Sequence, residues 1–226
     1  GFASALSWSA TFGIAYLAIE PFARRYWPNA LVSSTRVLRG RWNDTRLGRD
    51  LLVGVFGGTA ATLLVRLPTL AGFEAPFSSF HDVLENPLTH VGVLCSMLLA
   101  ALFVSLGRIA GLVLFRLMFR TTALACLADV VVFSAMEIGF QQFETASAWT
   151  LAILVECILM FLFVHFGFLT LFSAFCVLLL LETNLTLDSG SFYFANGVIT
   201  GTVVFAAAAI GCRIALGRRS IWNAFE

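Results

Sequence analysis

The sequence predicts an all-α fold: a polytopic membrane helical bundle of about seven transmembrane helices plus a short interfacial amphipathic helix. Composition leads to this prediction, because 59% of the residues are hydrophobic, 12% are charged and the mean hydropathy is +0.91. Soluble domains are roughly half apolar and a quarter charged, so a soluble fold of this length could not bury so much apolar surface. Several apolar stretches are long enough to cross a hydrocarbon core of about 30 Å. We therefore treat residues 1–226 as a single membrane domain.

The expected spans follow from the apolar runs and from the residues that interrupt them. The first run ends at Pro21 and the second at Pro68, because proline breaks the hydrogen bonding of a helix; Asp50 stands where the second helix would be capped. The apolar stretch from Trp149 to Leu181 is too long for one crossing, so we expect a hairpin with a tight turn near Gly167. The predicted spans are residues 2–19, 51–67, 91–115, 121–139, 149–164, 168–181 and 192–212.

The arginines predict the orientation of these spans. All 14 basic residues are arginine. Placing the arginine-rich intervals in the cytoplasm puts every arginine but Arg66 on one side, as the positive-inside rule requires. The segment then starts outside the cell, and its C-terminus is cytoplasmic.

Residues 20–50 form an arginine-rich interfacial segment on the cytoplasmic side. Leu31, Leu38 and Trp42 recur at a spacing that predicts a short helix lying on the membrane surface. Its arginines could bind anionic lipid headgroups or only set the topology, and the sequence favours neither reading. The candidate headgroup contacts are Arg24, Arg25, Arg36, Arg39 and Arg41.

Four charged residues fall inside predicted spans and are the candidate buried polar cluster: Arg108, Asp129, Glu137 and Glu156. A charge at the centre of a membrane helix costs at least about 2.5 kcal/mol, so such residues face the bundle interior and often act. Asp129 and Glu156 lie near the middle of adjacent spans, and Arg108 is within reach of Asp129 if those helices pack. The cluster could bind a ligand or a proton, but an internal ion pair that only fixes helix register is the commoner case.

No catalytic, cofactor or metal site is expected in this segment. The absence of lysine excludes a phosphate-binding lysine or a Schiff base, and no broad basic face predicts nucleic-acid binding. The five cysteines lie in apolar stretches and are expected to pack there. His81 and His90 share an external loop with acidic residues, which is compatible with a weak metal site, although a solvated loop is the commoner case.

Three GxxxG spacings would allow helices to approach closely: Gly54/Gly58, Gly107/Gly111 and Gly197/Gly201. Packing within the chain is the favoured expectation, and a homodimer through the same faces is the alternative.

Two runs, residues 15–28 (AYLAIEPFARRYWP) and 47–54 (LGRDLLVG), resemble the C-terminal membrane region of bacterial, acidobacterial-type serine/threonine protein kinases. Residues 163–169, 186–188 and 215–219 are similar to the hairpin, external loop and C-terminal end of that region. Residues 68–148 agree with it in hydropathy only. His165 and residues 193–196 depart from its pattern, which puts any ligand carried over from the family in doubt.

The resemblance implies a non-catalytic region that anchors a receptor-like kinase in the bacterial cytoplasmic (inner) membrane and takes part in sensing. It implies a cytoplasmic kinase domain upstream in the same chain, so the full-length protein would be an enzyme that uses ATP and Mg²⁺ there. No glycine-rich loop, HRD motif or strand lysine occurs in residues 1–226. The alternative is a small transporter or permease-like protein with Asp129, Glu137 and Glu156 along its polar path, although no internal repeat supports it.

Overall fold

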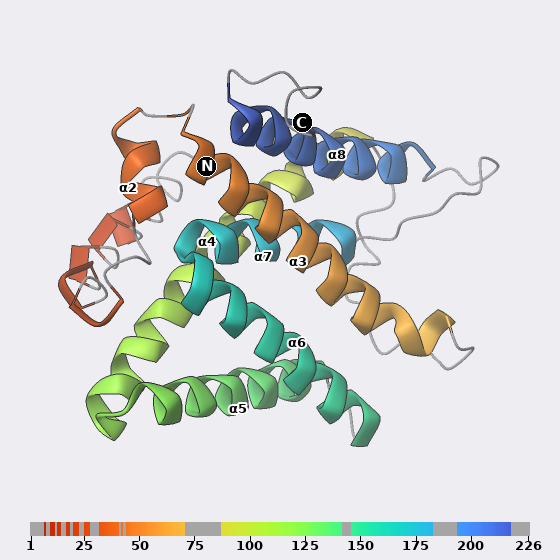
Figure 1. Ribbon diagram of the computed structural model, residues 1–226. Helices are drawn as coiled ribbons and strands as arrows, with labels where there is room; N and C mark the ends of the chain where they lie inside the picture. The colour runs from red at the N-terminus through yellow and green to blue at the C-terminus, as the bar shows by residue number, and fades with distance from the viewer. Residues whose placement is uncertain are drawn as a thin grey trace, which may run out of the picture.

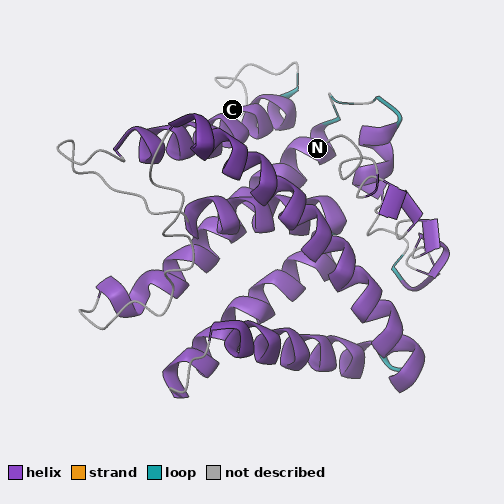
Figure 2. Ribbon diagram, turned by 180° about the vertical axis from the view of Figure 1, so that it is seen from behind, coloured by secondary structure: helices purple, strands orange, loops and turns teal. Residues whose placement is uncertain are grey.

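The computed structural model shows helices throughout the part of the chain that it describes, with no strand among those residues (Figures 1 and 2). It describes residues 7, 10, 11, 13, 14, 17, 18, 20–22, 25–27, 32–40, 42, 44–70, 87–141, 146–182 and 194–217. The helices are α2 (Val32–Leu38), α3 (Thr45–Leu70), α4 (Pro87–Phe119), α5 (Thr122–Gln141), α6 (Ala146–Phe166), α7 (Phe168–Glu182) and α8 (Phe194–Leu216).

Within the part of the chain that the structure describes, four helices are long and apolar enough to cross a membrane, which indicates a membrane protein. These stretches are Thr45–Leu67, His90–Phe119, Trp149–Phe166 and Phe194–Leu216. They expose large apolar side chains, including Phe56 (78%) and Phe205 (75%), as a surface that faces lipid would. Seven spans remain a prediction, and most of the expected span 2–19 lies outside the described residues.

The short helix α7 lies at the centre of the fold, with α3 packed along it in the same direction (Figure 1). Two glycines of α3 make this approach possible. A Cβ atom added to Gly54 would lie 1.8 Å from Ser173 Oγ, and one added to Gly58 would lie 2.4 Å from the Ala174 carbonyl oxygen. Side chains at these positions would collide with α7, so the Gly54/Gly58 pair packs helices within the chain.

The other two GxxxG spacings do not act as pairs in the same way. A Cβ atom at Gly111 would contact Asp129 and Phe133 on α5, whereas Gly107 and Gly201 face open space. Only Gly111 of these three glycines therefore makes a close helix contact.

The break at Gly167 divides the long apolar stretch into α6 and α7. Gly167 has a φ of +98°, in a region that side-chain-bearing residues rarely adopt. Its N–H donates to the Phe163 carbonyl at 2.9 Å, closing the end of α6. The two helices diverge from this point (Figure 1), and α7 is largely buried, with Leu171 and Ala174 fully inaccessible.

Helix α8 crosses α3 in the opposite direction and packs closely at one place. A Cβ atom at Gly48 would lie 2.2 Å from the Ala215 backbone nitrogen and 2.7 Å from the Gly211 carbonyl oxygen. The start of α3 therefore lies against the end of α8. Most of the remaining surface of α8 is accessible, and its buried residues are Asn196, Thr200 and Gly211.

Helices α4, α5 and α6 form a second group, in which α5 packs against α4 and α6 (Figure 1). The 33-residue α4 extends beyond the predicted 91–115 at both ends. Pro87 suits the first turn of a helix, where no N–H is needed. At the other end Arg120 has a φ of +57°, which stops the helix after Phe119.

Helix α3 is also longer than the predicted span 51–67, and Asp50 is not its cap. The helix begins at Thr45 because Asp44 Oδ1 accepts a hydrogen bond from the Arg46 N–H at 3.0 Å. It continues two residues beyond Pro68, since a proline in the last turn removes only one hydrogen bond. Asp50 is instead buried inside the first turns of the helix.

Candidate functional site: a buried ionic cluster

Three of the four predicted cluster residues meet in the interior, one from each of the helices α4, α5 and α6. The Arg108 Nε donates to Asp129 Oδ2 at 2.9 Å, and Nη2 of the same guanidinium forms an ion pair with Glu156. The exposed fractions are 1% for Arg108, 0% for Asp129 and 7% for Glu156. One arginine thus joins the three helices of the second group.

Aromatic rings and a glycine shape the space around Arg108. Its guanidinium carbon lies 4.5 Å from the centre of the Phe133 ring on α5 and 5.9 Å from that of Phe175 on α7. Both rings are close enough for cation–π attraction, which is stronger where water is excluded. A Cβ atom at Gly111 would lie 3.4 Å from Asp129 Oδ1, which is an ordinary van der Waals contact, so α4 lies directly against this carboxylate.

The cluster carries one formal positive charge against two carboxylates. Arg108 Nη1 and Asp129 Oδ1 are buried without a hydrogen-bond partner among the described residues. Breaking such a group by removing one partner is costly, because the remaining charges stay buried. The arrangement can hold three helices in register, and it can also take up a further proton or cation.

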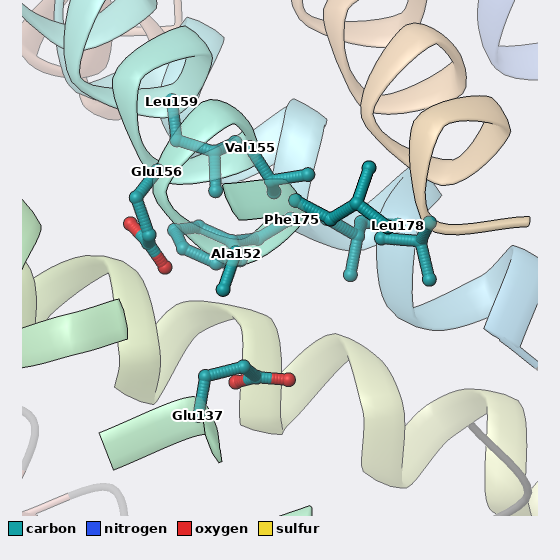
Figure 3. Close-up of a pocket in the computed structure, with 9 residues that line it drawn as sticks. Glu137, Ala152, Val155, Glu156, Leu159, Phe175 and Leu178 are labelled. Atoms are coloured by element: carbon teal, nitrogen blue, oxygen red, sulfur yellow. The ribbon is translucent and has the colours of Figure 1, made fainter. Parts of the chain in front are cut away.

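Glu137 lines a small pocket together with Glu156. Figure 3 shows Glu137 on α5 facing Ala152 and Glu156 on α6 across this pocket, whose volume is about 50 Å³. Glu137 is half-buried. The fourth predicted residue is therefore connected to the cluster through a shared cavity.

The predicted headgroup arginines are placed in different environments. Arg24 and Arg41 lie outside the described residues. Arg25 is exposed, with its guanidinium 5.9 Å from the Tyr26 ring, and Arg39 is exposed at the end of α2. Arg36 forms an ion pair with Asp44, so its charge is already balanced within the protein.

A short helix, α2, lies in the interval where the amphipathic helix around Leu31, Leu38 and Trp42 was predicted, but Leu31 lies outside the described residues and the exposed Trp42 lies beyond the end of α2. Its described buried side chains are Ser33 and Ser34. The Ser33 hydroxyl donates to the buried Asp50. The buried side chains described for this helix are therefore polar.

Asp44 is the capping residue at the start of α3, outside the membrane-spanning stretch. The hydrogen bond from the Arg46 N–H lowers the pKa of Asp44 below its usual value, and the hydrogen bond and charge of Arg36 lower this pKa further. The carboxylate therefore stays ionised well into the acidic range.

Arg49 and Asp50 form a contact that hydropathy did not indicate. Arg49 Nη2 lies 3.0 Å from Asp50 Oδ1, and its guanidinium carbon lies 5.6 Å from the centre of the Phe166 ring. This contact joins the start of α3 to the α6–α7 junction. The adjacent charges of Arg49 and Asp50, directly before the apolar run that starts at residue 51, were the only signal for it.

His90 is not in a solvated loop, as the sequence had suggested. It lies in the first turn of α4, is 3% exposed, and its Nε2 is 2.9 Å from Thr200 Oγ1 on α8. His81 lies outside the described residues. Within the described part of the chain, no three His, Cys, Asp or Glu side chains are grouped so that they could hold a metal ion.

The arginine-bearing helix ends gather at one end of the molecule. Arg116, near the end of α4, lies with its guanidinium carbon 5.3 Å from the Tyr26 ring centre. The neighbouring Trp27 packs against Phe163, close to the α6–α7 junction that Arg49 also contacts. The end of α8, which carries Arg213, lies against the start of α3. Arg66 is near the opposite end of α3 and donates to the Leu181 carbonyl.

Comparison of the chain with protein-family models, with curated proteins and with solved structures found no match.

Proposed function

We propose that this chain is the membrane-anchoring and sensory region of a bacterial receptor-like serine/threonine protein kinase, and that it is not itself catalytic. The observation that carries the anchoring role is the gathering of arginine-bearing helix ends at one end of the bundle. An end of this kind faces the cytoplasm under the positive-inside rule. The kinase assignment rests on the resemblance of residues 15–28 and 47–54 to the C-terminal membrane region of bacterial serine/threonine protein kinases.

The proposed topology has seven spans in the inner membrane, with the start of the segment outside and the C-terminus in the cytoplasm. The helix directions support it. Helices α3 and α7 run in the same direction, and α8 runs opposite to α3, as alternating crossings of the second, sixth and seventh spans demand. An upstream kinase domain on the cytoplasmic side would reach this start through one further span.

The sensory part of the proposal rests on the Arg108–Asp129–Glu156 cluster. A buried group of charges has few alternative arrangements, and each partner lies on a different helix. A ligand or proton that altered the charge of one carboxylate would shift the balance among three helices. That displacement could pass along α4 and α6 to the arginine-rich end.

A transporter is the second candidate, because two carboxylates from different helices line one pocket. A transporter would need this pocket to open alternately to both sides. The two proposals differ in what precedes this segment. A kinase domain in the upstream coding sequence would support the first proposal, and a further set of transmembrane spans would support the second.

The orientation is tested by fusing green fluorescent protein or alkaline phosphatase after Leu216. We expect fluorescence and no phosphatase activity, since a cytoplasmic end permits only the first. The reverse result would overturn the proposed topology.

Anionic lipid binding by the arginine-rich segment is tested with the full chain and liposomes of defined composition. Arg39→Gln should reduce the preference for phosphatidylglycerol over phosphatidylcholine, because an exposed arginine near the surface contributes about 1 kcal/mol. Arg36→Gln should reduce it less, since Arg36 is paired with Asp44. An equal preference in both variants and the wild type would leave topology as the sole role of these arginines.

A further inference from the structure

The pocket shared by Glu137 and Glu156 lies where four helices converge. Val65 stands near the end of α3, Glu137 near the end of α5, Leu178 near the end of α7 and Leu151 near the start of α6. These are the helix ends opposite to the arginine-rich end. Glu156 belongs both to this pocket and to the ionic cluster, so the pocket leads directly to Arg108.

The pocket combines two carboxylates with walls that are otherwise apolar. The remaining lining residues are Val65, Leu151, Ala152, Val155, Leu159, Phe175 and Leu178. Ca²⁺ and Mg²⁺ are bound by about six or more oxygen ligands, which these walls do not supply. An alkylammonium ion instead offers N–H donors to the carboxylates and an alkyl chain to the walls. The Phe175 ring adds a face that attracts cations.

Glu156 brings surplus negative charge to the pocket. It is 7% exposed and lines the pocket. Arg108 neutralises only one of the two carboxylates with which it pairs. The Oε2 of Glu156 is the atom that Arg108 Nη2 contacts, so a second cation in the pocket would share this carboxylate with Arg108. A buried carboxylate that no cation fully neutralises gains free energy when a positive charge reaches it.

The size of the pocket limits the ligand. Its volume of about 50 Å³ is far below the roughly 300–1,000 Å³ of pockets that hold drug-sized molecules. Only a compound with a few non-hydrogen atoms fits. Ala152 faces this space from α6 and is the smallest residue of the lining (Figure 3).

We infer that this pocket binds a small primary alkylammonium ion, with the ammonium group at Glu156 and Glu137 and the alkyl chain against α6 and α7. The bound cation competes with Arg108 for Glu156 and thereby acts on the cluster that joins α4, α5 and α6. The inference deepens the sensory part of the proposed function and rests on that function for its biological meaning. Binding of the cation itself requires only the pocket.

The test measures binding of radiolabelled methylammonium and n-butylammonium to the purified chain in phosphatidylcholine nanodiscs, with empty nanodiscs as background. We expect saturable binding by the wild type. Glu137→Gln and Glu156→Gln should each weaken the affinity about tenfold or more, as loss of one charged hydrogen bond predicts. Asp44→Asn removes the same charge at the opposite end and should leave the affinity unchanged.

Filling the pocket separates a true site from general attraction by acidic residues. Ala152→Phe retains both carboxylates and should abolish binding, whereas unchanged binding by this variant would overturn the inference. A competition series on the wild type keeps the test decisive if a variant does not fold: butylammonium should compete, and tetrabutylammonium should not. Equal competition by both would also overturn it. The upstream coding sequence tests the kinase proposal separately, and its result does not alter the binding measurement.

Discussion

The two groups of helices are held together by different chemistry. Helix α3 meets α7 and α8 through Gly54, Gly58 and Gly48, where backbone approaches backbone and no charge is involved. Helices α4, α5 and α6 meet at Arg108, where charged side chains span the distance between helices. Close packing without charges keeps one arrangement over a wide range of conditions. The stability of the ionic group depends instead on the charge state of its members.

The largest effect is expected when Arg108 is removed. Arg108→Met leaves Asp129 and Glu156 buried without their cation, and we expect a loss of about 3–5 kcal/mol in the free energy of unfolding. Unfolding of the full chain in mild detergent, followed by circular dichroism, measures it. Adding Asp129→Leu and Glu156→Leu to the same chain should recover most of the loss, because an apolar cluster has no charge to solvate. A triple variant no more stable than Arg108→Met would show that packing, and not charge, holds this group together.

Adding a methyl group to the glycine contacts should have a smaller effect. Gly58→Ala places a Cβ atom 2.4 Å from the Ala174 carbonyl oxygen, and overpacking of this kind costs about 1–3 kcal/mol. Gly107→Ala is the matched control, since nothing lies within 4 Å of its Cβ position; it should be neutral or stabilising. Equal effects of the two changes in the same unfolding measurement would contradict the close packing of α3 on α7.

The junction between the two groups can be tested at Gly167. Gly167→Ala forces a side chain onto a φ of +98°, and we expect destabilisation of about 1–2 kcal/mol. Cleavage by a soluble protease near residue 167 should increase, because strain there loosens the joint between α6 and α7. Gly201→Ala, on an open helix surface, serves as the control. An unchanged cleavage rate would contradict the role of Gly167 as the joint between α6 and α7.

The smallest effect is expected at Asp44, whose ion pair with Arg36 lies near water. Asp44→Ala should cost about 1 kcal/mol through loss of the helix cap. Because the pKa of Asp44 is lowered in the folded protein, its contribution is present above the pKa of the unfolded chain. It is lost as the pH falls through the folded-state pKa. The difference in stability between wild type and variant should therefore vanish in strong acid, and a constant difference at every pH would refute this assignment.

Hydropathy and glycine position were sufficient to anticipate the helices but not their ends. The apolar run around Gly167 exceeded a single crossing, so a break was required there. The start of α3 was misplaced by six residues because two acidic residues, Asp44 and Asp50, could each cap a helix. The choice between them depends on packing, since Ser33 and Arg49 hold Asp50 in a buried position.

For the site, the sequence likewise predicted which residues lie at the same depth but not which way their helices face. Matching depth in adjacent spans gave reason to place Asp129 beside Glu156. It could not show that Glu137 faces a pocket, because that depends on the rotation of α5 relative to α6. His90 was assigned to a loop because its partner Thr200 is 110 residues away in the chain. Contacts between distant helices leave no signal in the local pattern of either.

The length of α4 has a mechanical consequence. A helix of 33 residues measures about 50 Å, whereas the hydrocarbon core of a bilayer is about 30 Å thick. Such a helix tilts or extends into the headgroup region, and a thinner bilayer demands more tilt. Arg108 is carried on α4, so its position relative to Asp129 and Glu156 is linked to the thickness of the surrounding lipid. A change in bilayer thickness would therefore act on the ion pairs of Arg108 through the tilt of α4.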